Sequence, residues 1–475
     1  MSAPPSTTRW TFPVTTLAAF MVSLDNLVVT TALPEIRTSL GADLADLEWT
    51  VNAYTLTFGV LLLTGATLGE RFGRRRILGL GIALFTVASA LAALAPNVGT
   101  LIAARAVQGV GGAMILPLTL TMLSAAVAPE RRGAALGVWG AVSGLGVAFG
   151  PLIGGAVVDG WAWQWIFWIN VPVGILLAPI ALTRLSPARG TAQRLDLPGL
   201  GLITAGLLGI VWGLVRGNAA GWGSAEVVGS LVVGGALTAL FVAWEARTAH
   251  PMLPLRLFRN RGFAASNATA MLFSFGMFGS IFLLAQFLQT VQGAGPFEAG
   301  LKMLPWTAMP MLVAPLAGPL SDRIGGRPLL VVGLLLQAAG LAWLAGTMAP
   351  DTPYSTQWPA FVISGIGMAL FFVPIANVVL GSVSVADTGV ASGANNAIRE
   401  IGGVFGVAVL AAVFSHQGGY ASAQSYSDGT SVATWVGVGV VLAGAAAAVF
   451  VPGLRRSTPE PVVPPLAREP EPVPA

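Results

Sequence analysis

The sequence of 475 residues contains no cysteine, only two histidines, and few charged residues, which make up 9% of the chain. Without cysteine the chain has no thiol nucleophile, no thiolate metal ligand and no disulfide bond, and two histidines leave too few ligands for an ordinary zinc centre. So little charge cannot cover the surface of a water-soluble protein of this length. Because hydrophobic residues make up 55% of the chain, we predict an outer surface that faces mostly lipid.

Apolar runs of about 20 residues, the length of helix that crosses the hydrocarbon core of a bilayer, recur along the chain. Fourteen such runs are present, near residues 12–33, 47–68, 77–95, 98–119, 133–158, 163–183, 197–215, 226–245, 263–289, 299–320, 328–347, 357–380, 390–414 and 431–452. We therefore predict an all-α, multi-pass protein of the cytoplasmic membrane with 14 transmembrane helices.

The basic residues are distributed unequally between alternate loops. If the N-terminus is cytoplasmic, the inner loops and tails hold 19 of the 24 basic residues, and the outer loops hold Arg37, Arg216 and Lys302. This excess of positive charge on one side predicts that both termini are cytoplasmic. Because the arginines are scattered among loops and do not form a basic groove, we expect no nucleic-acid partner.

One loop sequence occurs twice, 252 positions apart, each time between two apolar runs. The two copies are Leu68-Gly69-Glu70-Arg71-Phe72-Gly73-Arg74-Arg75 and Leu320-Ser321-Asp322-Arg323-Ile324-Gly325-Gly326-Arg327. The eight apolar runs between the copies exceed by two the number that a plain six-helix duplication leaves. We predict six-helix bundles at residues 1–185 and 259–455, an inserted two-helix hairpin with linkers at 186–258, and a disordered, proline-rich cytoplasmic tail at 456–475.

Further short motifs follow in order along the chain. They are Leu24-Asp25 with Ala32-Leu33-Pro34, Arg105-Ala106-Val107-Gln108-Gly109, Gly146 to Gly155, Trp163-Gln164-Trp165-Ile166-Phe167 with Asn170-Val171-Pro172-Val173-Gly174, and Arg399-Glu400-Ile401-Gly402-Gly403. With the repeated loop, this ordered set resembles the fourteen-helix drug:proton antiporter branch of the major facilitator superfamily. The chain departs from the family pattern at Ala66, Glu70 and Gln164, where glycine, aspartate and arginine are usual.

The run at 133–158 carries a stripe of glycines. Gly146, Gly150 and Gly154 are spaced four apart, which lets a neighbouring helix approach backbone to backbone, and Pro151 removes one internal hydrogen bond and bends the helix. Such a seam can rock, whereas ordinary tight packing is the alternative. With Gly155, these residues match the signature that the resemblance associates with exporters, so we predict an exporter hinge.

The repeated loops predict a cytoplasmic latch between helices. An acid at a helix end, followed by arginines, can bond to a neighbouring helix terminus when the inner side closes and separate from it when that side opens. The alternative is that the arginines only orient the chain in the membrane. The predicted latch residues are Glu70, Arg71, Gly73, Arg74, Asp322, Arg323, Gly325 and Arg327.

Four charged residues lie well within apolar runs: Asp25, Arg105, Arg399 and Glu400. Each costs about 2.5–3.5 kcal/mol at a helix centre, so we expect them to be kept for function. A buried carboxylate whose arginine contact changes between two states can take up and release a proton. Asp25 and Arg105 both fall about 10–12 Å below the outer surface at 1.5 Å per residue and can meet. We predict that these four residues couple transport to protons; permanent structural ion pairs are the alternative.

The sequence gives less detail about the cargo. Phenylalanines and amides that recur along the runs at 263–289 and 357–380 suit large hydrophobic compounds, although an individual phenylalanine can equally face lipid. The candidate cavity residues are Tyr54, Gln108, Phe278, Phe282, Gln286, Gln289, Phe371, Asn377 and Asn396. The runs at 197–215 and 226–245 contain few polar groups, so we expect a peripheral hairpin outside the transport path.

The resemblance implies proton-coupled efflux of hydrophobic drug-like or antibiotic molecules across the cytoplasmic membrane by alternating access. It further implies a monomer in membrane lipid that is driven by the proton gradient and needs no cofactor. A substrate:proton symporter, a facilitator, a receptor and the inner-membrane subunit of a larger export assembly remain as alternatives. An enzyme is not expected, because no nucleophile elbow, metal cluster or phosphate-binding loop occurs in the sequence.

Overall fold

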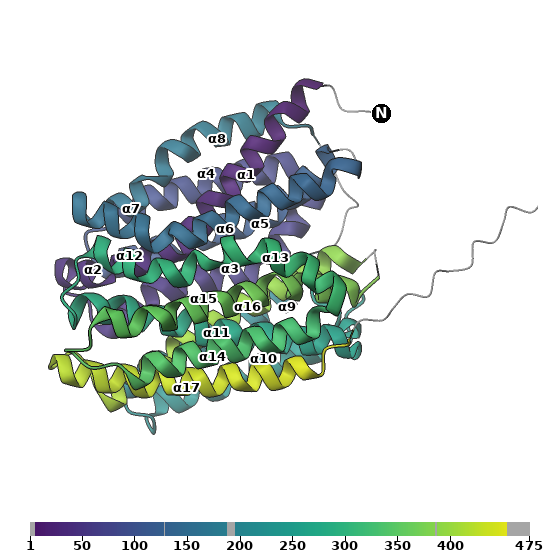
Figure 1. The fold of residues 1–475 in the computed structure, drawn as a ribbon. Helices are drawn as coiled ribbons and strands as arrows, with labels where there is room; N and C mark the ends of the chain where they lie inside the picture. The colour runs from purple at the N-terminus through teal and green to yellow at the C-terminus, as the bar shows by residue number, and fades with distance from the viewer. Residues whose placement is uncertain (1–4, 128, 188–194, 385–386, 454–475) are drawn as a thin grey trace, which may run out of the picture.

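The computed structural model describes residues 5–127, 129–187, 195–384 and 387–453, so the predicted tail at 456–475 lies outside the described residues. Within these ranges, 14 helical segments are long and apolar enough to cross a membrane. This confirms the predicted all-α fold with 14 transmembrane helices. Figure 1 shows the long helices running side by side through the molecule.

The first six spans are built from α1 (Pro5–Val28), α3 (Leu44–Phe72), α4 (Arg74–Ala93), α5 (Val98–Ala126), α6 (Pro129–Gly160) and α8 (Asn170–Arg184). Three short elements, η1 (Val29–Thr31), α2 (Leu33–Leu40) and α7 (Trp165–Trp168), lie between them. The helices α1, α3, α4, α5 and α8 share a core that includes Met21, Tyr54, Phe85 and Ile115, and α6 packs against α1. We call this group the N-terminal bundle.

The last six spans begin after the short helix η2 (Leu255–Arg259). They are α11 (Arg261–Thr290), the pair α12 (Pro296–Thr307) and α13 (Met309–Ile324), α14 (Gly326–Gly346), α15 (Tyr354–Gly381), α16 (Thr388–Gln417) and α17 (Ala423–Val449). Aromatic side chains such as Phe273, Phe361 and Phe371 fill much of the space between them. We call this group the C-terminal bundle.

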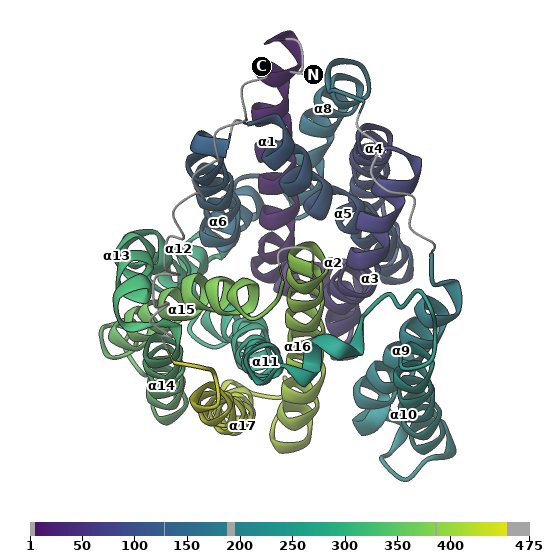
Figure 2. The ribbon, with the colours of Figure 1, turned by 90° about the vertical axis from the view of Figure 1, so that its right-hand side faces the viewer.

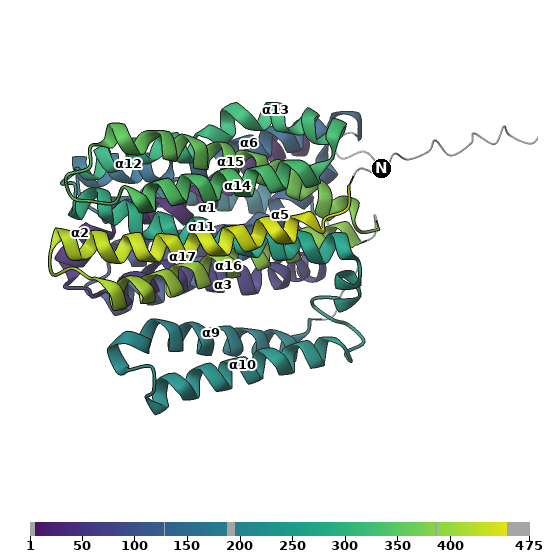
Figure 3. The same cartoon turned by 60° about the horizontal axis from the view of Figure 1, so that its bottom comes forward.

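The hairpin of α9 (Leu197–Ala220) and α10 (Ala225–Glu245) stands to one side of both bundles, as Figures 2 and 3 show. Its helix α9 contacts both bundles, because Val211 packs in a small apolar cluster with Val60 of α3 and Val404 of α16. The predicted peripheral place of the hairpin is therefore confirmed, and its attachment spans the boundary between the bundles.

The repeated loop folds alike in its two copies. Gly73 ends α3 and precedes α4 with φ 103°, and Gly325 ends α13 and precedes α14 with φ 87°. A residue with a β-carbon rarely adopts such positive φ values, so each tight turn between adjacent spans requires glycine. The arginines beside these turns mark this side of the molecule as the cytoplasmic one.

On the opposite, outer side the two bundles are in close contact. The Gln289 Nε2 of α11 donates to the Thr31 carbonyl oxygen at 3.0 Å, and the Arg37 guanidinium lies 3.6 Å from the centre of the Tyr420 ring. Burial raises the pKa of the Tyr420 hydroxyl, which therefore stays protonated and donates to Gln286 Oε1 at 2.6 Å. These contacts close the outer side in this structure.

Candidate functional site

Asp25 forms the centre of a fully buried polar cluster in the N-terminal bundle. Its Oδ2 accepts a hydrogen bond from Arg105 Nη1 at 2.5 Å, and its Oδ1 accepts from Gln108 Nε2 at 2.7 Å and Asn170 Nδ2 at 2.9 Å. Both Asp25 and Arg105 are 0% exposed. The meeting of Asp25 and Arg105, predicted from their matching depths, is present in the structure.

The neighbours of Arg105 complete this Asp25 cluster. Arg105 Nη1 also donates to Gln108 Oε1 at 2.7 Å, Arg105 Nε donates to the Thr50 carbonyl oxygen at 3.2 Å, and the guanidinium lies 4.3 Å from the Tyr54 ring centre. Gln108 Nε2 also donates to Ser89 Oγ at 2.9 Å. A buried ion pair is tolerated when further hydrogen bonds and ring contacts replace water around it, and here they do so for both Asp25 oxygens and for Arg105 Nε and Nη1, while Arg105 Nη2 is buried without a hydrogen-bond partner.

Glu400 is another buried carboxylate, and it lies where the two bundles meet. It is 3% exposed; Arg399 Nη2 lies 3.3 Å from its Oε1, and Asn26 Nδ2 of α1 donates to its Oε2 at 3.5 Å. The Glu400 Cβ lies 3.0 Å from the place where a β-carbon at Gly59 of α3 would stand. Although adjacent helical residues need not pair, Arg399 and Glu400 do so in this structure.

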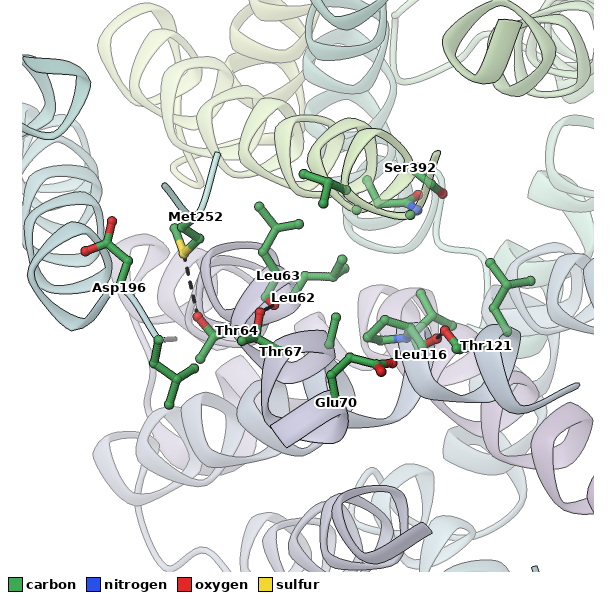
Figure 4. Close-up of a pocket in the computed structure, with 18 of the residues that line it drawn as sticks. Leu62, Leu63, Thr64, Thr67, Glu70, Leu116, Thr121, Asp196, Met252 and Ser392 are labelled. Atoms are coloured by element: carbon green, nitrogen blue, oxygen red, sulfur yellow. Dashed lines mark hydrogen bonds between the residues drawn. The ribbon is translucent and has the colours of Figure 1, made fainter. Parts of the chain in front are cut away.

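A cavity of about 340 Å³ opens between the bundles on the cytoplasmic side. Figure 4 shows side chains that line it, from α3, α5, α16 and the hairpin. The polar groups in its lining include Thr67, Thr121, Ser392 and Asn396. The structure is therefore closed on the outer side by direct contacts and has a cavity on the inner side.

The glycine stripe of α6 lies against α1. A β-carbon at Gly146 would stand 2.9 Å from the Phe20 carbonyl oxygen, one at Gly150 would stand 3.1 Å from Leu27 Cβ, and one at Gly154 would collide with the Val28 carbonyl oxygen. The predicted close approach of a neighbouring helix is confirmed. That this seam rocks during transport stays a prediction.

The next glycine faces the other bundle. A β-carbon at Gly155 would collide with the carbonyl oxygen of Pro296 in α12, and one at Gly300 would stand 2.5 Å from the carbonyl oxygen of Pro151. Thr307 Oγ1 donates to the Ala148 carbonyl oxygen at 2.6 Å beside them. The helix α6 therefore packs tightly within its own bundle on one face and across the bundle boundary on the other.

Comparison with known proteins identifies the family. The model of the Major Facilitator Superfamily matches residues 15–407 and, in a second match, residues 266–475. The chain belongs to the major facilitator superfamily. It is therefore a membrane transporter and not an enzyme.

Relatives within the superfamily include named exporters. The chain is 35% identical over 405 residues to the tetracenomycin C resistance and export protein of Streptomyces glaucescens, covering 85% of this chain and 75% of that protein. It is 38% identical over 459 residues to the cephamycin export protein CmcT of Amycolatopsis lactamdurans, covering 94% and 93%.

Solved structures support the fold. The crystal structure of a bacterial homolog of the human lysosomal transporter Spinster, inward-facing and unoccupied, matches with a TM-score of 0.68 at 18% identity, covering 94% of this chain and 98% of that one. The D-xylose-proton symporter matches with a TM-score of 0.65 at 15% identity, covering 94% and 98%.

The predicted latch of this major facilitator superfamily protein makes local contacts in the present structure, whose outer side is closed. Arg74 Nε and Nη2 donate to the two carboxylate oxygens of Glu70 at 2.6 and 2.9 Å, and Arg75 Nη1 donates to the Leu185 carbonyl oxygen at 3.2 Å. Arg71 lies over the Phe72 ring. In the second copy, Arg323 and Arg327 are exposed, and the side chain of Asp322 lies outside the described part of the chain.

Of the nine predicted cavity residues, Asn396 lines the cytoplasmic cavity. Tyr54 and Gln108 belong to the Asp25 cluster, Gln286 and Gln289 are bonded in the outer contact, and Asn377 is exposed. Phe282 and Phe371 are fully buried, Phe371 stacks on Phe273 with ring centres 3.8 Å apart, and Phe278 is packed beside Gly403. The described aromatic contacts among these rings are within the C-terminal bundle, where buried rings contribute to its core.

Sequence reasoning missed several groups of the site. Asn170 was part of a quoted motif, yet its bond to Asp25 depends on how α8 packs against α1. Leu197 and Leu200, at the cytoplasmic end of the hairpin, line the cavity, and the expectation that the hairpin lies outside the transport path stays a prediction. Within the described residues, no group of three or more His, Asp or Glu side chains could hold a metal ion.

Proposed function

We propose that this transporter exports hydrophobic, drug-like or antibiotic molecules across the cytoplasmic membrane in exchange for protons, by alternating access. The observation that carries the proposal is the position of Glu400 above the cavity. Asn396 lines the cavity, and Glu400 follows it by four residues on α16, so both lie on one face of the helix. A buried ionisable group at the boundary between bundles thus adjoins the space where cargo binds.

Movement of the bundles relative to each other changes the surroundings of Glu400 and therefore the affinity of its carboxylate for a proton. Its partners Asn26 and Gly59 belong to the N-terminal bundle, whereas Glu400 and Arg399 belong to the C-terminal bundle. Rocking about the α6 seam changes the surroundings of this carboxylate, and a carboxylate binds its proton more tightly in apolar surroundings and less tightly beside an arginine. Proton uptake from the outer side and release on the inner side then drive the cycle.

The names of the relatives support the direction of transport, since tetracenomycin C and cephamycin are exported by the proteins that carry those names. A proton that enters the cell down the membrane potential supplies about 2.3 kcal/mol for each 100 mV, in addition to its concentration gradient. This energy is sufficient for a moderate gradient of exported compound.

The test uses the purified full-length chain in liposomes with an imposed pH gradient and a panel of lipophilic dyes and antibiotics. We expect pH-driven transport that an uncoupler abolishes, with protons moving opposite to the compound. Transport that resists the uncoupler identifies a facilitator, and protons moving with the compound identify a symporter. No transport of any compound by the purified chain supports a receptor or a subunit of a larger assembly.

A further inference from the structure

The cytoplasmic end of the α9–α10 hairpin is held in one arrangement by two acidic residues. Asp196 Oδ1 accepts from the Gly199 backbone N–H at 2.9 Å at the start of α9, and both Asp196 oxygens accept from Trp244 Nε1 of α10 at 2.9 and 3.1 Å. Glu245 accepts from the backbone N–H groups of Met252 and Leu253 at 3.3 and 3.0 Å. The two helix ends and the loop after them therefore form one ordered unit.

This unit forms one side of the cytoplasmic cavity. Leu197, Leu200, Pro251 and Met252 all line it, and they bring an apolar surface to it. Figure 4 shows Met252 reaching α3, where Thr64 Oγ1 donates to Met252 Sδ at 3.7 Å. The thioether of methionine is flexible and polarisable, so this wall can adapt to ligands of different shape.

The remaining walls supply hydrogen-bonding groups without a free charge. Thr67 of α3, Thr121 of α5, and Ser392 and Asn396 of α16 line the cavity. Of the two carboxylates in the lining, Glu70 binds the Arg74 guanidinium through both oxygens. Asp196, on the hairpin side, accepts from the uncharged N–H groups of Trp244 and Gly199 and has no described cation partner. A volume of about 340 Å³ falls within the range of pockets that hold drug-sized ligands.

We propose that the hairpin is the apolar wall of the cargo-binding site. The cargo is an amphipathic organic molecule whose apolar face packs on Leu197, Leu200, Pro251 and Met252. Its hydrogen-bonding groups meet the hydroxyls and the amide of α3, α5 and α16. This inference rests on the proposed export function and gives the inserted helix pair a direct part in selecting the cargo.

Chemical labelling tests the proposal without depending on proton coupling. Because the chain contains no cysteine, Met252→Cys in the full-length protein introduces a single thiol at the cavity wall. The probe is Hoechst 33342, a flat aromatic dye with hydrogen-bonding edges, and its binding is followed by its own fluorescence. At a dye concentration ten times its Kd, we expect the rate of maleimide labelling to fall about tenfold, because bound protein is protected in proportion to occupancy.

The matched control is Arg247→Cys, which places a thiol in the exposed loop just after α10 and outside the cavity lining. Its labelling rate should not change with the dye. If the parent and both variants bind the dye but Met252→Cys is labelled at the same rate with and without it, the hairpin does not contact cargo and the proposal is wrong. If the parent neither binds nor transports any compound of the panel, the export function itself fails.

A second pair of variants tests the wall without a thiol. Leu200→Trp places a bulky side chain on the cavity side of α9, whereas Leu208→Trp places the same side chain on a part of α9 where leucine is 44% exposed. We expect Leu200→Trp to raise the Kd for Hoechst 33342 about tenfold or more, the scale of overpacking a filled site. Leu208→Trp should leave the Kd unchanged, and equal effects of the two variants would overturn the proposal.

Discussion

Asp25 and Glu400, two of the buried carboxylates of this transporter, differ in which bundle supplies their partners. Every described partner of Asp25 belongs to the N-terminal bundle: Arg105 and Gln108 on α5, and Asn170 on α8. Glu400 lies between the bundles, paired weakly with its own neighbour Arg399 and contacted by Asn26 across the boundary. The proposed rocking of one bundle against the other would leave the first set of contacts in place and alter the second.

This difference separates a carboxylate that is needed for the stability of a bundle from one that is suited to couple transport to protons. A buried charge that accepts hydrogen bonds from several fixed donors belongs to the stable structure of its bundle. Removing one of these donors leaves the charge unpaired and lowers the stability of the bundle strongly. A charge at a moving boundary contributes less to stability, but its affinity for a proton follows the conformation. We infer that Asp25 anchors the N-terminal bundle and that Glu400 is the carboxylate whose proton responds to the movement.

The largest expected effect on stability comes from removing the arginine that binds Asp25. Arg105→Ala leaves a carboxylate buried without its cation, which costs about 3–5 kcal/mol. We expect a large fall in the thermal unfolding temperature of the purified protein in detergent. Arg399→Ala is the matched variant, and its side chain is 22% exposed, so its effect should be much smaller. Equal losses of thermal stability in the two variants would show that the ion pairs of Asp25 and Glu400 contribute equally to the stability of the protein.

Two adjacent glycines of α6 allow the same comparison between a contact within one bundle and a contact across the boundary. Gly154 packs on α1 within the N-terminal bundle, and Gly155 packs on α12 across the boundary. An added methyl group in such a packed contact costs about 1–3 kcal/mol. Gly154→Ala should lower thermal stability, and Gly155→Ala should instead open the outer contact.

The opening is measured as faster maleimide labelling of Thr307→Cys from the outer side. Thr307 lies in the contact between α12 and α6, where it donates to Ala148. The control is Gly144→Ala, because a β-carbon at Gly144 meets nothing within 4 Å. If Gly155→Ala loses stability without faster labelling, α6 is a packing helix only and its seam does not separate.

The smallest effect is expected at an ion pair outside the membrane. Arg256 of η2 donates to both carboxylate oxygens of Asp387 at 2.6 and 3.0 Å. The Arg256 guanidinium lowers the pKa of Asp387 below its ordinary value. The pair therefore adds stability above the ordinary pKa of aspartate, about 3.9, and this contribution disappears as the pH falls through the lowered pKa.

Arg256→Ala should produce a small loss of thermal stability near neutral pH that vanishes in acid. Surface ion pairs contribute little compared with buried ones, so the loss should be far below that of Arg105→Ala. Arg247→Ala removes an exposed arginine without a described partner pair and serves as the control. A loss that stays constant from neutral to acidic pH would mean that Arg256 acts through packing and not through its charge.

The sequence was sufficient to predict what depends on residues close together in the chain. The 14 spans follow from runs of apolar residues, the turns at Gly73 and Gly325 follow from the repeated loop, and the close approach to α6 follows from glycine spacing. The contact of Asp25 with Arg105 followed from equal depth in the membrane, because the bilayer gives distant residues a common scale.

Features that depend on packing between distant helices could not be predicted in this way. Gln108 has the same polarity whether it faces cargo or Asp25, and only the packing of α5 against α1 decides between them. The cavity wall formed by Leu200 and Met252 depends on how the hairpin docks across both bundles. An apolar helix at the edge of a bundle shows no sequence signal that separates a lipid contact from a cavity wall.

The most direct test of proton coupling compares the parent chain, Glu400→Gln and Asp25→Asn/Glu400→Gln in liposomes with an imposed pH gradient. Dye binding and thermal unfolding are measured on the same preparations. We predict that Glu400→Gln still folds and binds the dye but no longer exports it in response to the pH gradient. Export at the parental rate by Glu400→Gln, or by the double variant, would contradict the proposed role of Glu400 in proton coupling.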